Sequence, residues 1–432
     1  MADHARSDDP AVQAQLDRFA QLSPGRDILG LERISALMAA LGNPHTRLPP
    51  VFHVAGTNGK GSTCTFLRFM LEAAGHRVHV YTSPHLVRFN ERIRVAGRLI
   101  ADDALAPLLA EVLDAAEAHD IAPSFFEATT AAAFLAFARS PADACVIEVG
   151  LGGRLDATNV IETPLVCGIA QLGVDHQAFL GDDAVAIARE KAGIAKAGVP
   201  LVTMGTQYPP EVQRAIIDVA NQASAPVFTK WGAKPGGANN HLVYGEGAEA
   251  YFHAPPPAVP GRHQICNAGL AIAMLRRQTK LSINAEALKA GVARAHWPAR
   301  LQRLSPGPLV RTGQEVWLDG THNPAAAGPV AAHFNGRAPL HLVCGILANK
   351  DAAGILAPFA NVATSLTAVA IHDHAHHPPT ELARLATALG MRATVADDLC
   401  SAVAQYPEKH VLILGSLYLA GEALRLNNEI PN

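Results

Sequence analysis

The sequence lacks a long hydrophobic run. Hydrophobic residues make up 49% of its 432 residues. Even so, no apolar stretch reaches the roughly 18–20 residues that a membrane-spanning helix needs. The first ten residues, MADHARSDDP, are polar and contain no apolar signal core. We therefore expect a cytoplasmic protein with a large hydrophobic core and no membrane partner.

The sequence also lacks an excess of charge and closely spaced cysteines. Its 35 basic and 38 acidic residues give a net charge of −3. No global field therefore attracts nucleic acid, and an anionic substrate must be held by local positive groups. None of the six cysteines forms a C-x-x-C pair, and Cys145, Cys167 and Cys344 fall in β-rich apolar runs. This pattern is typical of buried thiols in a reducing compartment.

Alternating strand and helix patterns predict an α/β protein of more than one domain. We expect a P-loop-type, mostly parallel sheet domain over residues 1–298, with a smaller Rossmann-like α/β domain over residues 299–432. The Gly-, Asn- and Pro-rich residues 231–262 predict loops around a short β excursion, to which we assign no role. Strands are predicted at 51–55, 77–81, 144–149, 164–170, 199–204, 315–319, 339–344, 366–371, 392–395 and 410–414.

The most informative stretch is the predicted strand 51–55 with the turn GTNGKGS after it and a helical pattern beyond. Glycines expose backbone N–H groups, the helix N-terminus favours an anion, and Lys60 supplies a positive charge. We interpret the stretch as a nucleotide phosphate cradle rather than an ordinary βα turn. A standard P-loop has Ser or Thr directly after its lysine to bind Mg²⁺. Here that residue is Gly61, so we expect metal ligands elsewhere.

Two later strand ends offer such ligands. Ser83 follows the strand 77–81 and should emerge at the sheet edge where open α/β folds bind ligands, although a plain Ser-Pro turn is the commoner explanation of the residues alone. Glu148 ends a continuous apolar strand and precedes a glycine turn. A carboxylate buried there is costly without a cation or hydrogen bonds, so Glu148 is a candidate for holding Mg²⁺.

Other polar residues carry weaker signals. Arg154 and Asp156 could face the same cleft as Glu148. The Asp-His pair at 175–176 is more typical of a local hydrogen bond than of a metal site. An exposed, salt-bridging side chain is the ordinary explanation of Lys191. The histidine-rich residues 372–377 are interpreted as a solvated loop.

Seven motifs in this order resemble the folylpolyglutamate synthase/dihydrofolate synthase family, within the Mur-type ATP-dependent amide ligases. The resemblance runs from about residue 30 to 422. The motifs are GTNGKGS (56–62), TSPHLVRFNERIR (82–94), EVGLGGRLDATN (148–159), REKAGI (189–194), ARLQ (299–302), DGTHNP (319–324) and GILANKD (345–351).

The resemblance implies site residues by position. The residues implied to bind the phosphates of ATP are Thr57, Asn58, Gly59 and Lys60. The implied ligands of the Mg²⁺ ions, of which we expect two, are Ser83, Glu148 and His176. Nucleotide contacts are also implied for Asn267, Arg300 and Asp319, the last two from the junction and the second domain. The implied pterin-binding residues are Ser124, Phe125, Phe126, Glu127, Leu155, Asp156 and Ala157. Lys191 corresponds to a lysine that is carbamylated in this group, a change that replaces a repelling ammonium with oxygen ligands.

The resemblance implies a reaction as well. With ATP as co-substrate, the enzyme would add L-glutamate to dihydropteroate, to the γ-carboxylate of tetrahydrofolate species, or to both, through an acyl phosphate. We expect a monomer. A Mur-type ligase acting on a nucleotide-linked sugar peptide is the nearest alternative, and the pterin-type segment 124–127 argues against it. A nucleotide-binding switch that uses the cradle without a carboxylate substrate is the alternative from another class.

Overall fold

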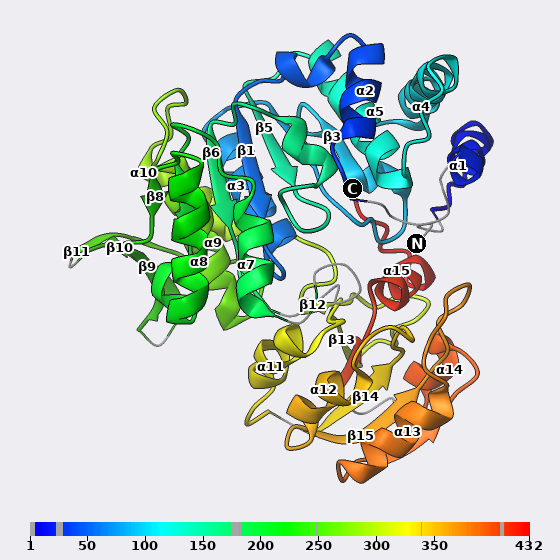
Figure 1. Ribbon diagram of the computed structural model, residues 1–432. Helices are drawn as coiled ribbons and strands as arrows, with labels where there is room; N and C mark the ends of the chain where they lie inside the picture. The colour runs from blue at the N-terminus through cyan, green and yellow to red at the C-terminus, as the bar shows by residue number, and fades with distance from the viewer. Residues whose placement is uncertain are drawn as a thin grey trace. The chain divides into compact units, whose positions relative to one another are not determined.

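The computed structural model describes residues 5–22, 29–173, 181, 183–237, 239–247, 249–337, 339–406 and 410–432. It divides into two compact units, each with its own sheet (Figure 1). The first unit contains residues 1–258, 264–295 and 432, and the second contains residues 259–263 and 296–431. None of the helices in these ranges combines the length and hydropathy that crossing a bilayer requires.

The first unit is built on an eight-stranded sheet in the order β4-β3-β2-β5-β1-β6-β7-β8. Six neighbouring strands, β2 to β8 in this order, pair in parallel, and the pairings of β3 with β2 and of β4 with β3 at one edge are antiparallel. Because β1 lies between β5 and β6, the loops that follow these three strands meet at one sheet edge. The strands are β1 (Val51–Ala55), β2 (Val78–Tyr81), β3 (Ile93–Val95), β4 (Arg98–Leu99), β5 (Ala144–Glu148), β6 (Val166–Ile169), β7 (Leu201–Thr203) and β8 (Val227–Phe228).

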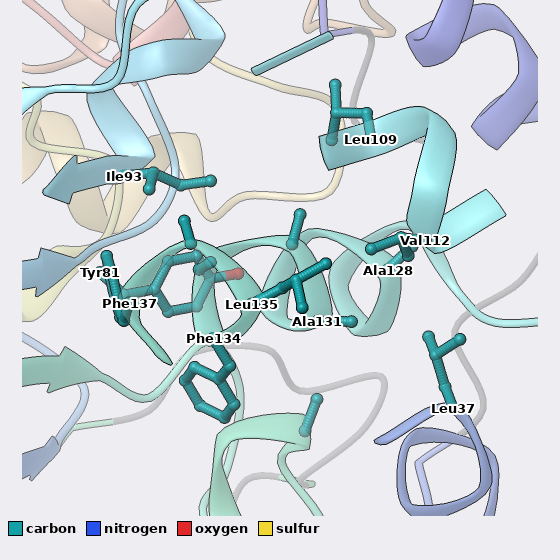
Figure 2. Close-up of a cluster of buried hydrophobic side chains, with 14 of the residues drawn as sticks. Leu37, Tyr81, Ile93, Leu109, Val112, Ala128, Ala131, Phe134, Leu135 and Phe137 are labelled. Atoms are coloured by element: carbon teal, nitrogen blue, oxygen red, sulfur yellow. The ribbon is translucent and has the colours of Figure 1, made fainter. Parts of the chain in front are cut away.

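Helices cover this sheet. The apolar helix α5 packs with α4 and with strand residues such as Tyr81 and Ile93 in one buried cluster (Figure 2). Helix α3, which starts at the end of β1, contacts β1, β2 and β5 and pairs with α10, and α7 lies beside α8. The helices are α1 (Pro10–Leu22), α2 (Glu32–Ala40), α3 (Lys60–Ala73), α4 (Asp102–Ala118), α5 (Phe125–Arg139), α7 (Ala184–Ala192), α8 (Pro210–Gln222), α9 (Arg262–Leu275) and α10 (Ala285–Arg294).

The second unit has a six-stranded sheet in the order β12-β13-β17-β14-β15-β16, parallel except for β12. Its own buried cluster joins α11, α12 and α13 to the strands. Its elements are β12 (Gln302–Arg303), β13 (Glu315–Leu318), α11 (Pro324–His333), β14 (Leu340–Cys344), α12 (Ala352–Leu356), β15 (Ala363–Ala368), α13 (Pro379–Ala388), β16 (Arg392–Val395), α14 (Leu399–Ala404), β17 (His410–Leu414) and α15 (Leu417–Leu426).

The predicted fold class is confirmed, with two corrections. Residues 231–254 form a three-stranded antiparallel sheet, β9 (Trp231–Gly236), β10 (His241–Glu246) and β11 (Glu249–Ala254), which is more than a short β excursion. Trp231 and Ala233 of this sheet lie against Gly269 of α9, so tertiary packing holds strands that are rich in glycine and proline. Strand β15 begins three residues before the predicted start, because Ala363 and Ser365 pair with β14 although the sequence there is less apolar.

A buried histidine links β1 to the turn after β5. His53 is fully buried, and its Nε2 lies 2.8 Å from Oγ1 of Thr158. The Thr158 hydroxyl donates in turn to Asp156, so it accepts the His53 hydrogen bond. Burial lowers the pKa of His53 to about 3. The folded protein therefore keeps this imidazole neutral over a pH range in which the unfolded chain would protonate it.

His53 should make the free energy of unfolding fall with acidification. The unfolded state binds its proton near pH 6.5 and the folded state near pH 3, so stability is lost as the pH falls between these values. Between pH 7.5 and pH 5.5 the loss from this residue should be about 1.4 kcal/mol. Urea unfolding at both pH values should show that extra loss in the wild type relative to His53→Gln. Equal pH dependence of the two proteins would contradict the assignment.

Candidate active site

The cradle lies between the end of β1 and the start of α3. Gly59 occupies the left-handed region with φ 81°, and a Cβ there would collide with the side chain of Asn267 in α9. Glycine is therefore required for the turn and for the close approach of Asn267. The structure thus brings together the loop and a nucleotide-binding candidate that is distant in sequence.

Two backbone N–H groups of the loop are already hydrogen-bonded, whereas the sequence predicts exposed N–H groups there. The N–H groups of Thr57 and Asn58 donate to the carbonyl of Gln171, at 2.8 and 3.0 Å, and the Thr57 hydroxyl donates to the carbonyl of Gly173 at 2.8 Å. The segment after β6 therefore braces the loop. The first N–H groups of a helix have no intrahelical acceptor. The donors that can bind an anion are therefore those at the start of α3, which begins at Lys60.

Lys60 is folded back over its own loop. Its Nζ donates to the carbonyl of Thr57 at 3.2 Å, and the side chain is partly exposed. A single carbonyl is a weak partner for an ammonium, whereas a phosphate would be a charged one. The lysine is therefore held at the loop by a contact that a nucleotide phosphate could replace.

Glu148 and Ser83 meet at the ends of β5 and β2. Glu148 is 5% exposed, and its Oε2 accepts the backbone N–H of Ser83 at 3.3 Å. A carboxylate with a neighbouring hydroxyl is a set of hard oxygen donors of the kind that Mg²⁺ prefers. The residues present therefore fit a magnesium ion beside the cradle. His176, the third predicted ligand, lies outside the described residues together with Asp175, and no cluster of three or more His, Cys, Asp or Glu side chains suited to a metal occurs within them.

Lys191 is buried, so the ordinary explanation of an exposed, salt-bridging lysine is wrong. It is 4% exposed on α7, and its Nζ donates to the carbonyl of Gly56 at 3.0 Å. The glycine turn after Glu148 packs closely beside it, because a Cβ on Gly153 would lie 2.8 Å from the Lys191 carbonyl oxygen. Lys191 is thereby placed at the cradle by both neighbouring loops.

Glu127 caps α5 and binds an arginine that the sequence reading had not singled out. Its Oε2 accepts the N–H of Ser124 at 2.6 Å, and the Ser124 hydroxyl accepts the N–H of Glu127 at 3.3 Å, which forms a capping box. Arg33 of α2 donates to both Glu127 oxygens at 3.0 Å. A bidentate pair of this kind fixes geometry as well as charge. The spacing S-F-F-E signals the capping box, but no local pattern pairs Arg33 with Glu127.

Phe125 and Phe126, the next two predicted pterin residues, begin helix α5. The ring of Phe126 lies against Gly150, Phe125 packs on Phe19 and Phe89, and Leu155 and Ala157 flank Asp156. These neighbours place the Phe126 ring at the glycine turn that follows β5.

Asp156 is turned into its own loop. It is 3% exposed, and its oxygens accept hydrogen bonds from the N–H of Leu151 at 2.8 Å and from the N–H and hydroxyl of Thr158. Burial raises the pKa of Asp156, and these hydrogen bonds oppose the rise. It therefore does not share an open cleft with Arg154, which is exposed and pairs with Glu190 at 3.0 Å.

In the second unit, Asp319 fastens the segment that carries Arg300. One Asp319 oxygen accepts the N–H of Leu301 at 2.8 Å, and the other accepts the N–H of Thr321 at 2.9 Å. The Arg300 side chain donates to the carbonyl of Ala299 at 2.8 Å. The geometry of Arg300 thus depends on Asp319.

The histidine-rich residues 372–377 are tied to their surroundings. His377 Nε2 lies 2.9 Å from the Lys350 carbonyl oxygen, and the His374 ring packs on Tyr418 with 3.7 Å between centroids. Residues 372–377 are all exposed or partly exposed, which agrees with the interpretation as a solvated loop, and these contacts hold part of that loop in place. His322 of the second unit has Nδ1 2.9 Å from the Gly320 carbonyl oxygen.

The fold and the cradle define a class, an α/β protein with a P-loop-type nucleotide site and a second α/β unit. No protein-family model matches the chain. The dihydrofolate synthase/folylpolyglutamate synthase of Bacillus subtilis is 41% identical over 307 residues, 68% of this chain and 69% of that protein. A probable bifunctional folylpolyglutamate synthase/dihydropteroate synthase of Haloferax volcanii is 35% identical over 91% of this chain, which spans 48% of that relative.

Solved structures agree with these relatives over nearly the whole chain. The E. coli FolC structure in complex with DHPP and ADP has a TM-score of 0.86 and 31% identity, and the match covers 98% of each chain. A bifunctional folylpolyglutamate synthase/dihydrofolate synthase with Mn, AMPPNP and L-glutamate bound has a TM-score of 0.83 and 30% identity, over 96% of this chain and 97% of that one. The chain belongs to the dihydrofolate synthase/folylpolyglutamate synthase family of ATP-dependent ligases. The predicted family is thereby confirmed.

Proposed function

We propose that this enzyme couples ATP to the formation of an amide between L-glutamate and a pteroate or folate carboxylate. The observation that carries the proposal is the meeting of three groups at one sheet edge. The cradle with Lys60 follows β1, Glu148 ends β5, and Ser83 follows β2. The relatives, which include complexes with DHPP and with L-glutamate, support the choice of substrates.

The reaction proceeds in two steps. A carboxylate oxygen of the pteroate or folate attacks the γ-phosphorus of ATP, which releases ADP and leaves an acyl phosphate. The amine of L-glutamate then attacks the acyl carbon, and phosphate leaves as the nitrogen loses a proton. The chain's own contribution is positioning and charge: Lys60 and the start of α3 stabilise the negative charge on the transferred phosphoryl group.

Ser83 and Glu148 would hold Mg²⁺, with His176 as the third proposed ligand. When bound, the ion would neutralise charge on the nucleotide phosphates.

The rest of the proposed nucleotide site in the first unit consists of Thr57, Asn58, Gly59 and Asn267. The nucleotide contacts of Arg300 and Asp319 stay predictions. Phe126 is the best placed of the proposed pterin contacts, because its ring lies at the glycine turn after Glu148.

The cysteines support a cytoplasmic location. All six are free thiols, and Cys64, Cys145, Cys167 and Cys344 are buried. A chain with this many unpaired thiols suits a reducing compartment. The expected monomeric state stays a prediction.

Release of phosphate from ATP should depend on both the carboxylate substrate and L-glutamate. We expect turnover with ATP, Mg²⁺, L-glutamate and either dihydropteroate or tetrahydrofolate, assayed in parallel, with the product mass increased by one or more glutamyl residues. Omission of either organic substrate should reduce phosphate release to background. Hydrolysis that persists without L-glutamate would favour the nucleotide-binding switch instead.

Two side chains of the cradle region should be needed for turnover but not for folding. Lys60→Ala and Glu148→Ala should each lower kcat by at least about 100-fold, because each removes a charge that acts on the phosphates or the metal. Circular dichroism and thermal unfolding should stay close to the wild type. The exposed Lys280→Ala serves as a matched control with normal activity. Near-normal turnover in either site variant would refute these roles.

Lys191 should carry a carbamate in the active enzyme. Its Nζ is buried beside the Gly56 carbonyl of the cradle, and carbamylation would replace an ammonium there with oxygen ligands. Protein equilibrated with ¹³C-bicarbonate should show a carbamate carbon signal by NMR that is lost in Lys191→Ala. A spectrum without that signal in active wild-type enzyme would rule the modification out.

A further inference from the structure

The carboxylate of Glu91 holds the loop that carries Ser83. Residues 82–88 connect β2 to the short 3₁₀ helix η2 (Phe89–Arg92), in which Glu91 lies. Glu91 Oε1 accepts the N–H groups of Val87 and Arg88 at 2.9 and 2.6 Å, and Oε2 accepts the N–H of Leu86 at 2.8 Å. Three successive backbone donors of the loop therefore converge on one side chain.

The same loop is closed at its base and braced once more near its tip. The N–H of Thr82 donates to the Arg92 carbonyl at 3.0 Å, next to the pairing of Tyr81 with Ile93. Arg92 is 2% exposed, and its Nε donates to Nδ1 of His85 at 2.9 Å. Ser83 thus lies between two anchored points, and its N–H reaches Glu148.

We propose that Glu91 is a positioning residue for metal binding: it fixes the loop 82–88 so that the Ser83 hydroxyl stays beside Glu148. This inference rests on the proposed roles of Ser83 and Glu148 as metal ligands. Residues behind metal ligands commonly contribute about 10–100-fold in metal affinity, because they hold the ligands in place.

The chemistry at Glu91 requires both carboxylate oxygens. Glutamine has the same shape, but its amide nitrogen would point a donor at one or more of the three N–H groups. Aspartate keeps both oxygens but is one methylene shorter, so it cannot reach all three donors from the same backbone position. Glu91→Gln therefore removes hydrogen bonds while leaving the packing volume almost unchanged.

The test measures Mn²⁺ affinity in the presence of ADP, by the loss of the EPR signal of free Mn²⁺. Glu91→Gln should weaken Mn²⁺ binding by about 10-fold or more, while ADP affinity without metal changes less than about twofold. Asp398→Asn is the matched control, because it weakens a carboxylate cap on α14 in the second unit, where Asp398 accepts the N–H of Ser401 at 2.6 Å. It should bind Mn²⁺ as the wild type does.

The outcomes separate this inference from the proposed function. Wild-type Mn²⁺ affinity in a folded Glu91→Gln protein would overturn the positioning role, as would equal losses of metal and nucleotide binding. If Glu91→Gln does not fold, Glu91→Asp is measured instead, with the same expected loss and the same overturning result. Ligase turnover by the wild type is assayed separately. If the wild type shows no turnover but Mn²⁺ affinity still depends on Glu91, the proposed function is refuted and the positioning role of Glu91 stands.

Discussion

A buried carboxylate must find hydrogen bonds or a cation, and the loops around this site are built on that constraint. Glu91 and Asp156 in the first unit each accept several donors from the loop that they close, and Asp319 does the same within the second unit. Glu127 does the same at the start of α5, with an arginine added. Glu148 accepts the N–H of Ser83 at 3.3 Å, from the loop that follows the neighbouring strand β2. These carboxylates hold the loops that they close, and the metal role proposed for Glu148 depends on its place at the end of β5 beside Ser83.

Much of this architecture is predictable from sequence, because its signals are local. The run Val51–Ala55 followed by GTNGKGS specifies a strand, a turn and a helix start, and the apolar run before Glu148 specifies a central strand. Parallel strands then bring the ends of β1, β2 and β5 to the same edge. The family motifs identified the ligase class for a related reason, since five of the seven lie at or directly after the ends of the strands β1, β2, β5, β13 and β14.

The rest depends on contacts between distant segments, which a local pattern does not contain. Nothing near Arg33 indicates that it pairs with Glu127, and nothing near Thr57 indicates that Gln171 occupies its N–H. Burial also decides what a polar residue can do. Asp156 looked available for a ligand, but its oxygens are turned into the loop, and Lys191 looked exposed, but it is enclosed by two loops.

The contact between Gly59 and Asn267 has a consequence for biosynthesis. The cradle begins at β1 near the N-terminus, but α9, which packs on it, is translated long afterwards. A nascent chain folds from its N-terminus as synthesis proceeds, so a contact between segments far apart in the sequence forms only after the later segment has been made. A nascent chain that ends before α9 therefore has the glycine turn without the side chain packed against it. The glycine turn of this protein therefore reaches its packed form only after α9 has been made.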